Sequence, residues 1–346
     1  MRAGETSLGK STLNKNVLLN NTLPEKKVNM MPVMAYDAKI YVAGHTGLVG
    51  SALVLELQRQ GYTNLVLRTT HELDLRDSQA TRAFFESERP EYVFLGAAKV
   101  GGIKANSDYP ADFIYDNLMI SANVIDAAYR TGVKKLLFLG SSCIYPRLCP
   151  QPIKEEYLMS GPLEPTNDAY ALAKIAGIKL CQAYNRQHCT HFIAAMPTNL
   201  YGPRDNFSLD SGHALPAFIA RMSAAKERGD KEVAIWGTGT VYREFLYVDD
   251  CAQALIYLMN FYDGTDIVNV GTGQDATIRE LAEKVKKAVG FAGELVFDTS
   301  KPDGTPRKLL DVTRLSALGW RASTSLEDGI AQTVAWYKEY AQEVKK

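Results

Sequence analysis

The feature that most constrains the fold is a glycine-rich turn between an apolar segment and a segment with helical spacing. Residues 38–44 read AKIYVAG and have the β-branched, apolar character of a buried strand. Residues 47–61 read GLVGSALVLELQRQG, with apolar side chains at helical spacing and a terminal glycine. Gly44, Gly47 and Gly50 lie after the strand and at the start of the helix, so the sequence predicts strand, tight turn and helix.

The alternation of strand and helix continues to about residue 202. Further strands are predicted at 64–69, 91–98, 134–142 and 192–202, and helices at 78–89, 112–132 and 166–187. Each strand is almost entirely apolar, as strands are when helices cover both faces of a parallel sheet. We therefore expect an α/β fold built on a doubly wound parallel sheet.

Beyond about residue 201 the elements become shorter, and glycine, proline, aspartate and asparagine become frequent. This change predicts a second, smaller C-terminal α/β substrate domain. We expect the dinucleotide-binding domain to comprise residues 38–205 and about 240–272, and the smaller domain to comprise about 206–239 and 273–340.

Residues 1–37 differ from the rest, because they show neither sustained periodicity nor the apolar core of a secretory signal. They are interpreted as a disordered leader, or as sequence upstream of a later start at Met30, Met31 or Met34. An organelle-targeting segment is the alternative, and its scarce arginine and its acidic residues argue against it.

Charge and cysteine content exclude several classes of partner. Lysine plus arginine and aspartate plus glutamate both number 39, so no net charge favours nucleic acid or an anionic membrane. No apolar run reaches the roughly 18 residues of a membrane span. The five cysteines have no regular spacing and no CxxC pair, which argues against a disulfide framework and a structural zinc. We expect no metal, and a reducing compartment, the cytoplasm.

The position of the three glycines predicts a dinucleotide site rather than a purely structural turn. The first would permit the turn, the second would let a pyrophosphate approach the backbone, and the third would let helix and strand pack closely. NAD binders usually carry an acid at the end of the second strand, where this chain has Arg68, Thr69 and Thr70. The sequence therefore favours NADP(H), with Asp74 near the adenine.

Three polar residues predict carbonyl chemistry beside this cofactor. Tyr170 and Lys174 are four residues apart on a predicted helix, so they share one face, and Ser141 ends the fourth strand. A Tyr-xxx-Lys pair alone is common on helix surfaces. Together with the glycine turn it resembles the extended short-chain dehydrogenase/reductase superfamily, with its Rossmann fold. We expect Tyr170 to donate a proton, Lys174 to lower its pKa, and Ser141 to bind the substrate oxygen.

Cys143, two residues past Ser141, is by itself typical of a core thiol. Its surroundings change this interpretation, because several segments of about residues 38–340 resemble the GDP-L-fucose synthase family. These segments are AAKVGGI, YPADFI, GSSCIYP, AYALAKIAGIKLC, MPTNLYGPRDNF, WGTGTVYREFLYVDD and SKPDGTPRKLLD.

The resemblance implies two reactions in one pocket. Protons leave carbons 3 and 5 of GDP-4-keto-6-deoxy-D-mannose and return on the opposite faces, and NADPH then reduces the C4 ketone. Cys143 and His213 match the two residues that exchange these protons in the family. A thiol and an imidazole have ordinary pKa values near 8.5 and 6.5, so both can exchange protons near neutral pH.

The resemblance also implies binding residues and a homodimer built on the helices around 113–130 and Tyr170. The implied cofactor contacts are Gly44, Thr46, Gly47, Leu48, Val49, Gly50, Arg68, Asp74, Ala97, Ala98, Lys99, Leu139, Gly140, Ser141, Lys174, Pro197, Asn199, Leu200 and His213. The implied contacts with the GDP-sugar are Asn199, Arg221, Trp236, Arg243 and Asp303.

The chain departs from the family pattern at the cofactor. Thr46 stands where many relatives have arginine, and Thr70 stands where another basic residue helps to bind the 2′-phosphate. Arg68 and His71 are the candidates to compensate.

Two other functions are compatible with the fold. A nucleotide-sugar 4-epimerase or 4,6-dehydratase would keep NAD tightly bound, but dehydratases carry an acidic pair where this chain has Ser142 and Cys143. A redox-sensing or RNA-associated scaffold would typically have lost Tyr170 or Lys174, and the chain has no basic surplus for RNA.

Overall fold

The computed structural model describes residues 32–209, 212–301 and 303–344. Most of the predicted leader, residues 1–31, lies outside these ranges. Of its last residues, Met34 is buried in a hydrophobic core, and its backbone N–H donates a 3.0 Å hydrogen bond to Asn260 Oδ1. Part of the segment predicted as leader is therefore packed against the core.

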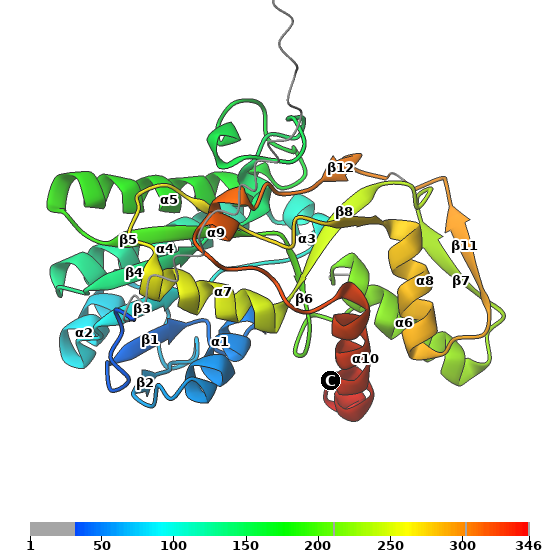
Figure 1. Cartoon of the computed structure of the whole chain (residues 1–346), viewed down its shortest axis with the longest axis horizontal. Helices are drawn as coiled ribbons and strands as arrows, with labels where there is room; N and C mark the ends of the chain where they lie inside the picture. Colours follow the sequence, from blue (N-terminus) through cyan, green and yellow to red (C-terminus); the bar gives the residue numbers. More distant parts are fainter. Residues whose placement is uncertain (1–31, 210–211, 302, 345–346) are drawn as a thin grey trace, which may run out of the picture. The chain divides into compact units, whose positions relative to one another are not determined.

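A six-stranded parallel sheet forms the centre of the region predicted to bind the dinucleotide (Figure 1). Its spatial order is β2-β1-β3-β4-β5-β9, and every neighbouring pair is parallel. The strands are β1 (Ile40–Ala43), β2 (Leu65–Val66), β3 (Tyr92–Leu95), β4 (Lys135–Leu139), β5 (Phe192–Pro197) and β9 (Val268–Val270).

Helices cover both faces of this sheet. α1 (Leu48–Arg59) and α7 (Val248–Phe261) share one hydrophobic core with alternate strand residues, while α2 (Ser78–Glu88), α4 (Pro110–Arg130) and α5 (Asp168–His188) share a second core with the intervening ones. In β1, Ile40 and Val42 belong to the first core, and Tyr41 and Ala43 to the second. Burial on both faces explains why the strands lack polar alternation. The predicted doubly wound fold is confirmed.

Three elements differ from the predicted ones. β2 ends at Val66, because this edge strand pairs with β1 over two residues only, and Arg68 therefore lies beyond the sheet. The strand predicted at 192–202 divides, and β6 (Asn199–Tyr201) leaves the parallel sheet to pair with β8 (Tyr242–Tyr247). A short helix, α3 (Ile103–Asp108), precedes α4.

The remaining elements form two small sheets and a third hydrophobic core. β8 lies between β10 (Asp275–Thr277) and β12 (Arg307–Lys308), and β7 (Glu232–Trp236) pairs with β11 (Glu294–Asp298). The third core includes residues of α6 (Ala214–Arg228), α8 (Ile278–Val289) and α10 (Leu326–Val344). The helix α9 (Thr313–Ala317) and the 3-10 turns Ser142–Ile144 and Glu155–Tyr157 complete the chain. We propose that the third core belongs to the smaller domain expected from the sequence.

Within the described ranges, none of the helices has the length and apolarity needed to cross a membrane. The same residues contain no cluster of three or more histidine, cysteine, aspartate or glutamate side chains that could hold a metal ion.

Candidate active site

The glycine turn is shaped for close backbone packing at two positions and is open at the third. Gly44 has φ +83°, and a Cβ there would lie 2.8 Å from Ala97 N. A Cβ at Gly50 would lie 2.0 Å from Gly44 O. At Gly47 the nearest atom, again Gly44 O, is 3.5 Å away, so internal packing does not require a glycine there.

Gly47 instead leaves space outside the turn. It is exposed, as is Thr46, and it forms the N-cap of α1 with no side-chain hydrogen bond to the first turn. The first N–H groups of a helix lack intrahelical partners and attract anions. These residues therefore fit a dinucleotide pyrophosphate at this helix end.

On the adenosine side, the Arg68 guanidinium lies just beyond β2 and is already anchored. It is 2.6 Å from the Glu88 carboxylate, donates to Leu67 O at 2.8 Å, and lies 5.7 Å from the centroid of the Phe84 ring. The ion pair fixes the orientation of the guanidinium. The Glu88 carboxylate also neutralises part of the positive charge that Arg68 would offer to a 2′-phosphate.

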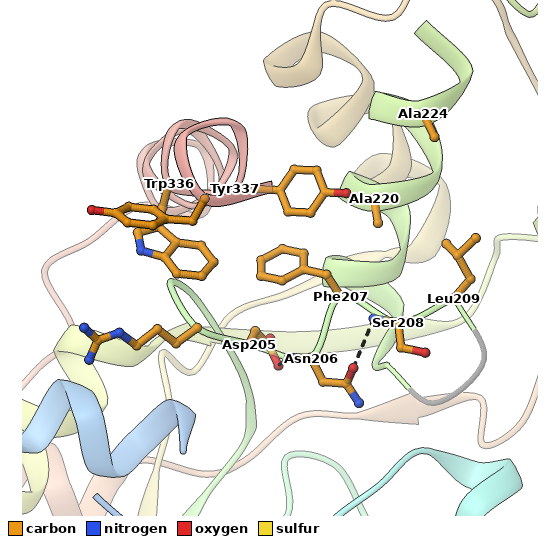
Figure 2. A pocket seen from close by; sticks show the side chains of 11 residues that line it. Asp205, Asn206, Phe207, Ser208, Leu209, Ala220, Ala224, Trp336 and Tyr337 are labelled. Carbon is orange, nitrogen blue, oxygen red and sulfur yellow. Dashed lines mark hydrogen bonds between the residues drawn. The ribbon is translucent and has the colours of Figure 1, made fainter. Parts of the chain in front are cut away.

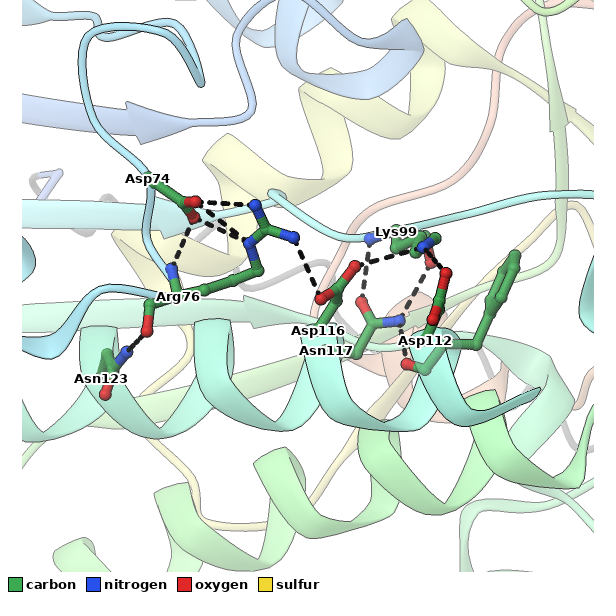
Figure 3. Close-up of polar contacts among 8 residues, drawn as sticks. Asp74, Arg76, Lys99, Asp112, Asp116, Asn117 and Asn123 are labelled. Atoms are coloured by element: carbon green, nitrogen blue, oxygen red, sulfur yellow. Dashed lines mark hydrogen bonds and ion pairs between the residues drawn. The ribbon is translucent and has the colours of Figure 1, made fainter. Parts of the chain in front are cut away.

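Asp74 and Lys99 belong to a polar network along α4 (Figure 3). Arg76 joins Asp74, at 2.7 Å, to Asp116, at 3.2 Å, and its hydrogen bonds hold the pKa of Asp74 below its usual range. Lys99 Nζ lies 2.8 Å from Asp112 and 3.3 Å from Asp116. The network therefore fixes the loops after β2 and β3 to one helix.

Several predicted cofactor contacts lie at the carboxyl ends of parallel strands. Ala97 and Ala98 follow β3, Leu139 ends β4 and Gly140 follows it, and Pro197 ends β5. Carboxyl ends of parallel strands meet at one edge of the sheet, where ligands of doubly wound folds bind. Leu200, on β6, follows β5 directly, and Leu48 and Val49 open α1.

Ser141, Tyr170 and Lys174 meet at the end of β4. Ser141 caps the 3-10 turn that follows, and its Oγ accepts a 3.3 Å hydrogen bond from the Cys143 N–H. Tyr170, on α5, is hydrogen-bonded to Ser141. Lys174 is buried one turn further along α5, and its Nζ donates to Leu139 O at 2.7 Å and lies 5.8 Å from the centroid of the Tyr170 ring.

The titration of this group differs from the sequence-based expectation. Burial raises the pKa of Tyr170, and nearby Cys143 raises it further. The hydrogen bond from Ser141 lowers this pKa, but by less. Part of the residue is solvent accessible, but its phenol lies among protein atoms. Burial also lowers the pKa of Lys174 to about 8. A neutral phenol is the form that can donate a proton to a ketone oxygen.

Lys308 contacts one of the two residues expected to exchange protons and acts electrostatically on the other. It extends from β12, and its Nζ donates to Cys143 Sγ at 3.8 Å. His213 is the N-cap of α6. The residue keeps solvent access, but desolvation of its imidazole lowers the pKa of His213, and the charge of Lys308 lowers it further. The charge of one cation therefore acts on both Cys143 and His213.

The residues expected to bind the nucleotide come from four segments of the smaller region. Arg221, on α6, donates to Ala234 O of β7 at 2.7 Å, and burial lowers its pKa. Trp236, at the end of β7, is exposed. Burial lowers the pKa of Arg243 on β8, and Asp303 opposes that shift.

Asp303 is held by the turn that follows Trp236. It accepts from Thr238 N at 2.7 Å and from Thr238 Oγ1 at 2.9 Å. Asn199, on β6, donates to Glu244 O beside Arg243. Hydrogen bonds, charge and chain neighbours around β8 therefore link four of the expected binding residues: Asn199, Trp236, Arg243 and Asp303.

A pocket of about 730 Å³ lies elsewhere, between the loop after β6 and the helices α6 and α10 (Figure 2). Its lining residues are Arg204, Asp205, Asn206, Phe207, Ser208, Leu209, Ala220, Ala224, Trp336, Tyr337 and Tyr340. None of them is a predicted site residue. Phe207 stacks on Trp336 with ring centroids 5.9 Å apart, so the aromatic side chains largely pack against one another. We place the chemistry at the strand ends.

Sequence reasoning missed two residues of this arrangement, Lys308 and Glu244. Both lie inside segments that carried the family resemblance, SKPDGTPRKLLD and WGTGTVYREFLYVDD. No local pattern marks either of them, because their partners, Cys143 for one and the backbone of Leu310 for the other, are distant in sequence.

Residues 40–271, more than half of the chain, match the model of the NAD dependent epimerase/dehydratase family. The chain belongs to this family of nicotinamide-dependent enzymes. GDP-L-fucose synthase 1 of Arabidopsis thaliana is 60% identical over 301 residues, covering 87% of this chain and 93% of the relative. GDP-L-fucose synthase of Escherichia coli strain K12 is 54% identical over 310 residues, covering 87% and 97%.

A solved structure gives the same result. The crystal structure of a GDP-L-fucose synthetase from Naegleria fowleri bound to NADP has a TM-score of 0.86 and 33% sequence identity, and covers 91% of this chain and 97% of that chain. Within its family, the chain belongs with the GDP-L-fucose synthases.

Proposed function

We propose that the chain catalyses the NADPH-dependent 3,5-epimerisation and 4-reduction of GDP-4-keto-6-deoxy-D-mannose to GDP-L-fucose. One structural observation supports this proposal independently of the relatives' names. Cys143 lies beside the Ser141–Tyr170 pair, and the Lys308 ammonium that donates to its sulfur also lowers the pKa of His213. Carbonyl reduction alone requires neither a thiol nor an imidazole at this place.

One oxygen site serves both reactions. Ser141 and Tyr170 are hydrogen-bonded to each other, so their hydroxyls are close enough to turn toward a single substrate oxygen when it binds. When a C–H bond beside the ketone loses its proton, negative charge develops on that oxygen, and fixed donors stabilise it. In the reduction, the neutral phenol of Tyr170 gives its proton to the same oxygen.

Cys143 and His213 exchange the protons at carbons 3 and 5. The lowered pKa leaves the His213 imidazole neutral at pH 7, with a lone pair that can accept a proton. The Lys308 ammonium donates to the Cys143 sulfur, so a positive charge accompanies the negative charge that the sulfur carries after giving up its proton. A positioned acid or base typically contributes about 10²–10⁴-fold to the rate.

NADPH, when bound, supplies the hydride for carbon 4. We propose that the turn around Gly47 and the N-terminus of α1 hold its pyrophosphate, and that Lys174 binds the ribose beside the nicotinamide. Arg68, anchored by Glu88, supports NADPH over NADH because its guanidinium lies just beyond β2.

Arginines of the smaller region hold the GDP moiety. The planar guanidinium groups of Arg221 and Arg243 suit diphosphate oxygens, and partial desolvation of both strengthens such contacts. Asp303 binds sugar hydroxyls, and the exposed Trp236 contributes a flat apolar wall.

We infer a homodimer that forms through α4 and α5, which pack side by side. Tyr115 on α4 and Leu172 on α5 are 62% and 49% exposed, and Ala176 extends the exposed apolar surface by one helical turn. Exposed apolar surface on two packed helices fits a second copy of the same chain. Leu172→Arg should halve the mass measured by light scattering, and an unchanged mass would argue for another interface.

We propose the cytoplasm as the working compartment. All five cysteines carry free thiols, including exposed Cys189 and partly exposed Cys143. Exposed free thiols persist in reducing surroundings. Fractionation of cells that express the full chain would test this location.

The direct test is incubation with GDP-4-keto-6-deoxy-D-mannose and either NADPH or NADH, with product identification and absorbance at the nicotinamide band. GDP-L-fucose should form with NADPH. In deuterated water, Cys143→Ser should lose deuterium incorporation at C3 and C5 while it still binds NADPH. Tyr170→Phe should lose hydride transfer. Reduction without inversion at either carbon would refute the epimerase half of the proposal.

A further inference from the structure

Glu244 lies on β8 next to Arg243, and none of its surface is exposed. Its Oε1 accepts hydrogen bonds from the N–H groups of Thr272 at 2.6 Å and Gly273 at 2.8 Å, and from the Thr272 hydroxyl at 3.3 Å. Its Oε2 accepts from the N–H of Leu310 at 2.9 Å. One carboxylate thus joins β8, the loop after β9 and the segment after β12.

The loop after β9 is shaped around this carboxylate. A Cβ at Gly271 would lie 2.3 Å from Glu244 Oε1, so only glycine allows the backbone to approach so closely. Burial raises the pKa of Glu244, whereas the N–H donors of Leu310, Gly273 and Thr272 lower it. The three N–H donors to its two oxygens match an ionised carboxylate, which only accepts hydrogen bonds.

The segments that Glu244 joins carry groups of the active site. Lys308 pairs with Arg243 across β12 and β8, and Leu310 is two residues beyond Lys308. The Lys308 ammonium reaches the Cys143 sulfur at 3.8 Å. Because the Glu244 side chain is fully enclosed, it acts through these neighbours and not by touching a substrate.

We propose that Glu244 is a positioning residue, whose carboxylate fixes the end of β12 against β8 and thereby holds the Lys308 ammonium beside the Cys143 sulfur. This inference rests on the function proposed above. An amide in place of the carboxylate would turn an N–H group toward one of the buried donors and leave at least one of them unsatisfied. The strand end would then move, and the contact between Lys308 and Cys143 would loosen.

Glu244→Gln tests the proposal. We expect the KM for GDP-4-keto-6-deoxy-D-mannose to rise about tenfold and deuterium incorporation at C3 and C5 to fall about 10–100-fold. The Kd for NADPH should change less than twofold, because the glycine turn makes no contact with Glu244. Thr272→Val removes the 3.3 Å hydroxyl bond to Glu244, and with it the bonds of the same hydroxyl to Gln274 O at 3.0 Å and from Gln274 N at 3.1 Å. It keeps the N–H donor to Glu244, so it should show only a two- to threefold effect in the same direction.

Asp250→Asn is the matched control. Asp250 is also a buried carboxylate, and it accepts hydrogen bonds from Ser323 N at 3.2 Å and Thr324 N at 2.8 Å. The segment that it holds carries no predicted site residue. This variant should lose comparable stability and keep wild-type KM and deuterium incorporation.

Two further measurements separate positioning from general destabilisation. Adding Glu244→Gln to Lys308→Met should cause no further loss of deuterium incorporation, because both changes remove one interaction. The rate at which iodoacetamide alkylates Cys143, measured on the peptide that contains it, should differ from the wild-type rate. It should be the same in Glu244→Gln and in Lys308→Met. Three outcomes would overturn the proposal: additive losses of deuterium incorporation in the double variant, a wild-type alkylation rate in Glu244→Gln, or an equal loss of incorporation in Asp250→Asn. A wild-type chain that converts no such sugar would refute the function, and alkylation would still decide the role of Glu244.

Discussion

The Lys308 ammonium and the Cys143 sulfur lie 3.8 Å apart, although 165 positions separate the two residues in the sequence. The same ammonium lowers the pKa of His213 on α6. Lys308 therefore brings a positive charge to both residues that we expect to move protons at carbons 3 and 5. An imidazole that must stay neutral to accept a proton benefits from that charge, because a nearby cation disfavours its protonation.

Replacing Lys308 with methionine should slow epimerisation more than reduction. The change keeps an unbranched side chain, one heavy atom shorter, and removes its charge. Deuterium incorporation at C3 and C5 should fall about 10–100-fold, while the Kd for NADPH should stay within twofold of wild type. Lys154→Met, at an exposed ion pair with Glu156, is the control and should behave as wild type. Unchanged incorporation in Lys308→Met would exclude Lys308 from the proton transfers.

In the pH–rate profile of the epimerisation, the acid limb should lie below pH 6.5. The folded chain lowers the pKa of His213, so the imidazole remains neutral until the pH falls below its ordinary value. Protonation then removes the acceptor, and deuterium incorporation should drop. Lys308→Met removes one cause of the lowering, so its acid limb should move to higher pH. A profile measured between about pH 5 and 8 checks both points. A limb above 6.5, or one unaffected by Lys308→Met, would contradict the assignment.

Replacing Lys174 with methionine should stabilise the chain and abolish hydride transfer. Lowering the pKa of the buried ammonium from 10.5 to about 8 corresponds to about 3 kcal/mol at pH 7. The lost hydrogen bond to Leu139 O costs about 1 kcal/mol, so the free energy of unfolding should rise by about 2 kcal/mol.

The pH dependence of stability gives the sign of the Lys174 effect. Between about pH 8 and 10.5 the unfolded chain binds the proton that the folded chain has lost, so wild-type stability should rise with pH across this window. The advantage of Lys174→Met should shrink over the same range. Thermal unfolding at pH 7 and above pH 10 measures it. A variant that is less stable than wild type at pH 7 would show that the ammonium is well solvated.

Local patterns were enough to predict the parallel sheet and the glycine turn. The apolar runs at 38–44 and 91–98 lie in strands that are buried on both faces, and Gly44 and Gly50 are required by contacts a few residues away or across one neighbouring strand. Tyr170 and Lys174 share a helix face because four residues complete about one turn.

What the sequence did not reveal depends on long-range contacts. The strand predicted at 192–202 divides because Asn199–Tyr201 pairs with β8, more than forty residues later. Glu244 looks like an ordinary charged residue in a strand until the N–H groups of Thr272, Gly273 and Leu310 surround it. Such pairings depend on how distant segments pack, so periodicity along the chain does not predict them.

Alanine at Gly47 and at Gly50 should separate cofactor binding from folding. Gly50→Ala places a methyl group 2.0 Å from Gly44 O, so the backbone must shift, and we expect a loss of about 1–3 kcal/mol in the free energy of unfolding. Gly47 has φ −80°, which alanine adopts without strain, and its nearest neighbour is 3.5 Å away, so Gly47→Ala should melt like wild type. Its methyl group would stand at the N-terminus of α1, where we place the pyrophosphate, and the Kd for NADPH should rise at least about tenfold. Thermal unfolding and fluorescence titration with NADPH measure the two effects, and wild-type affinity in Gly47→Ala would mean that the phosphates bind away from this turn.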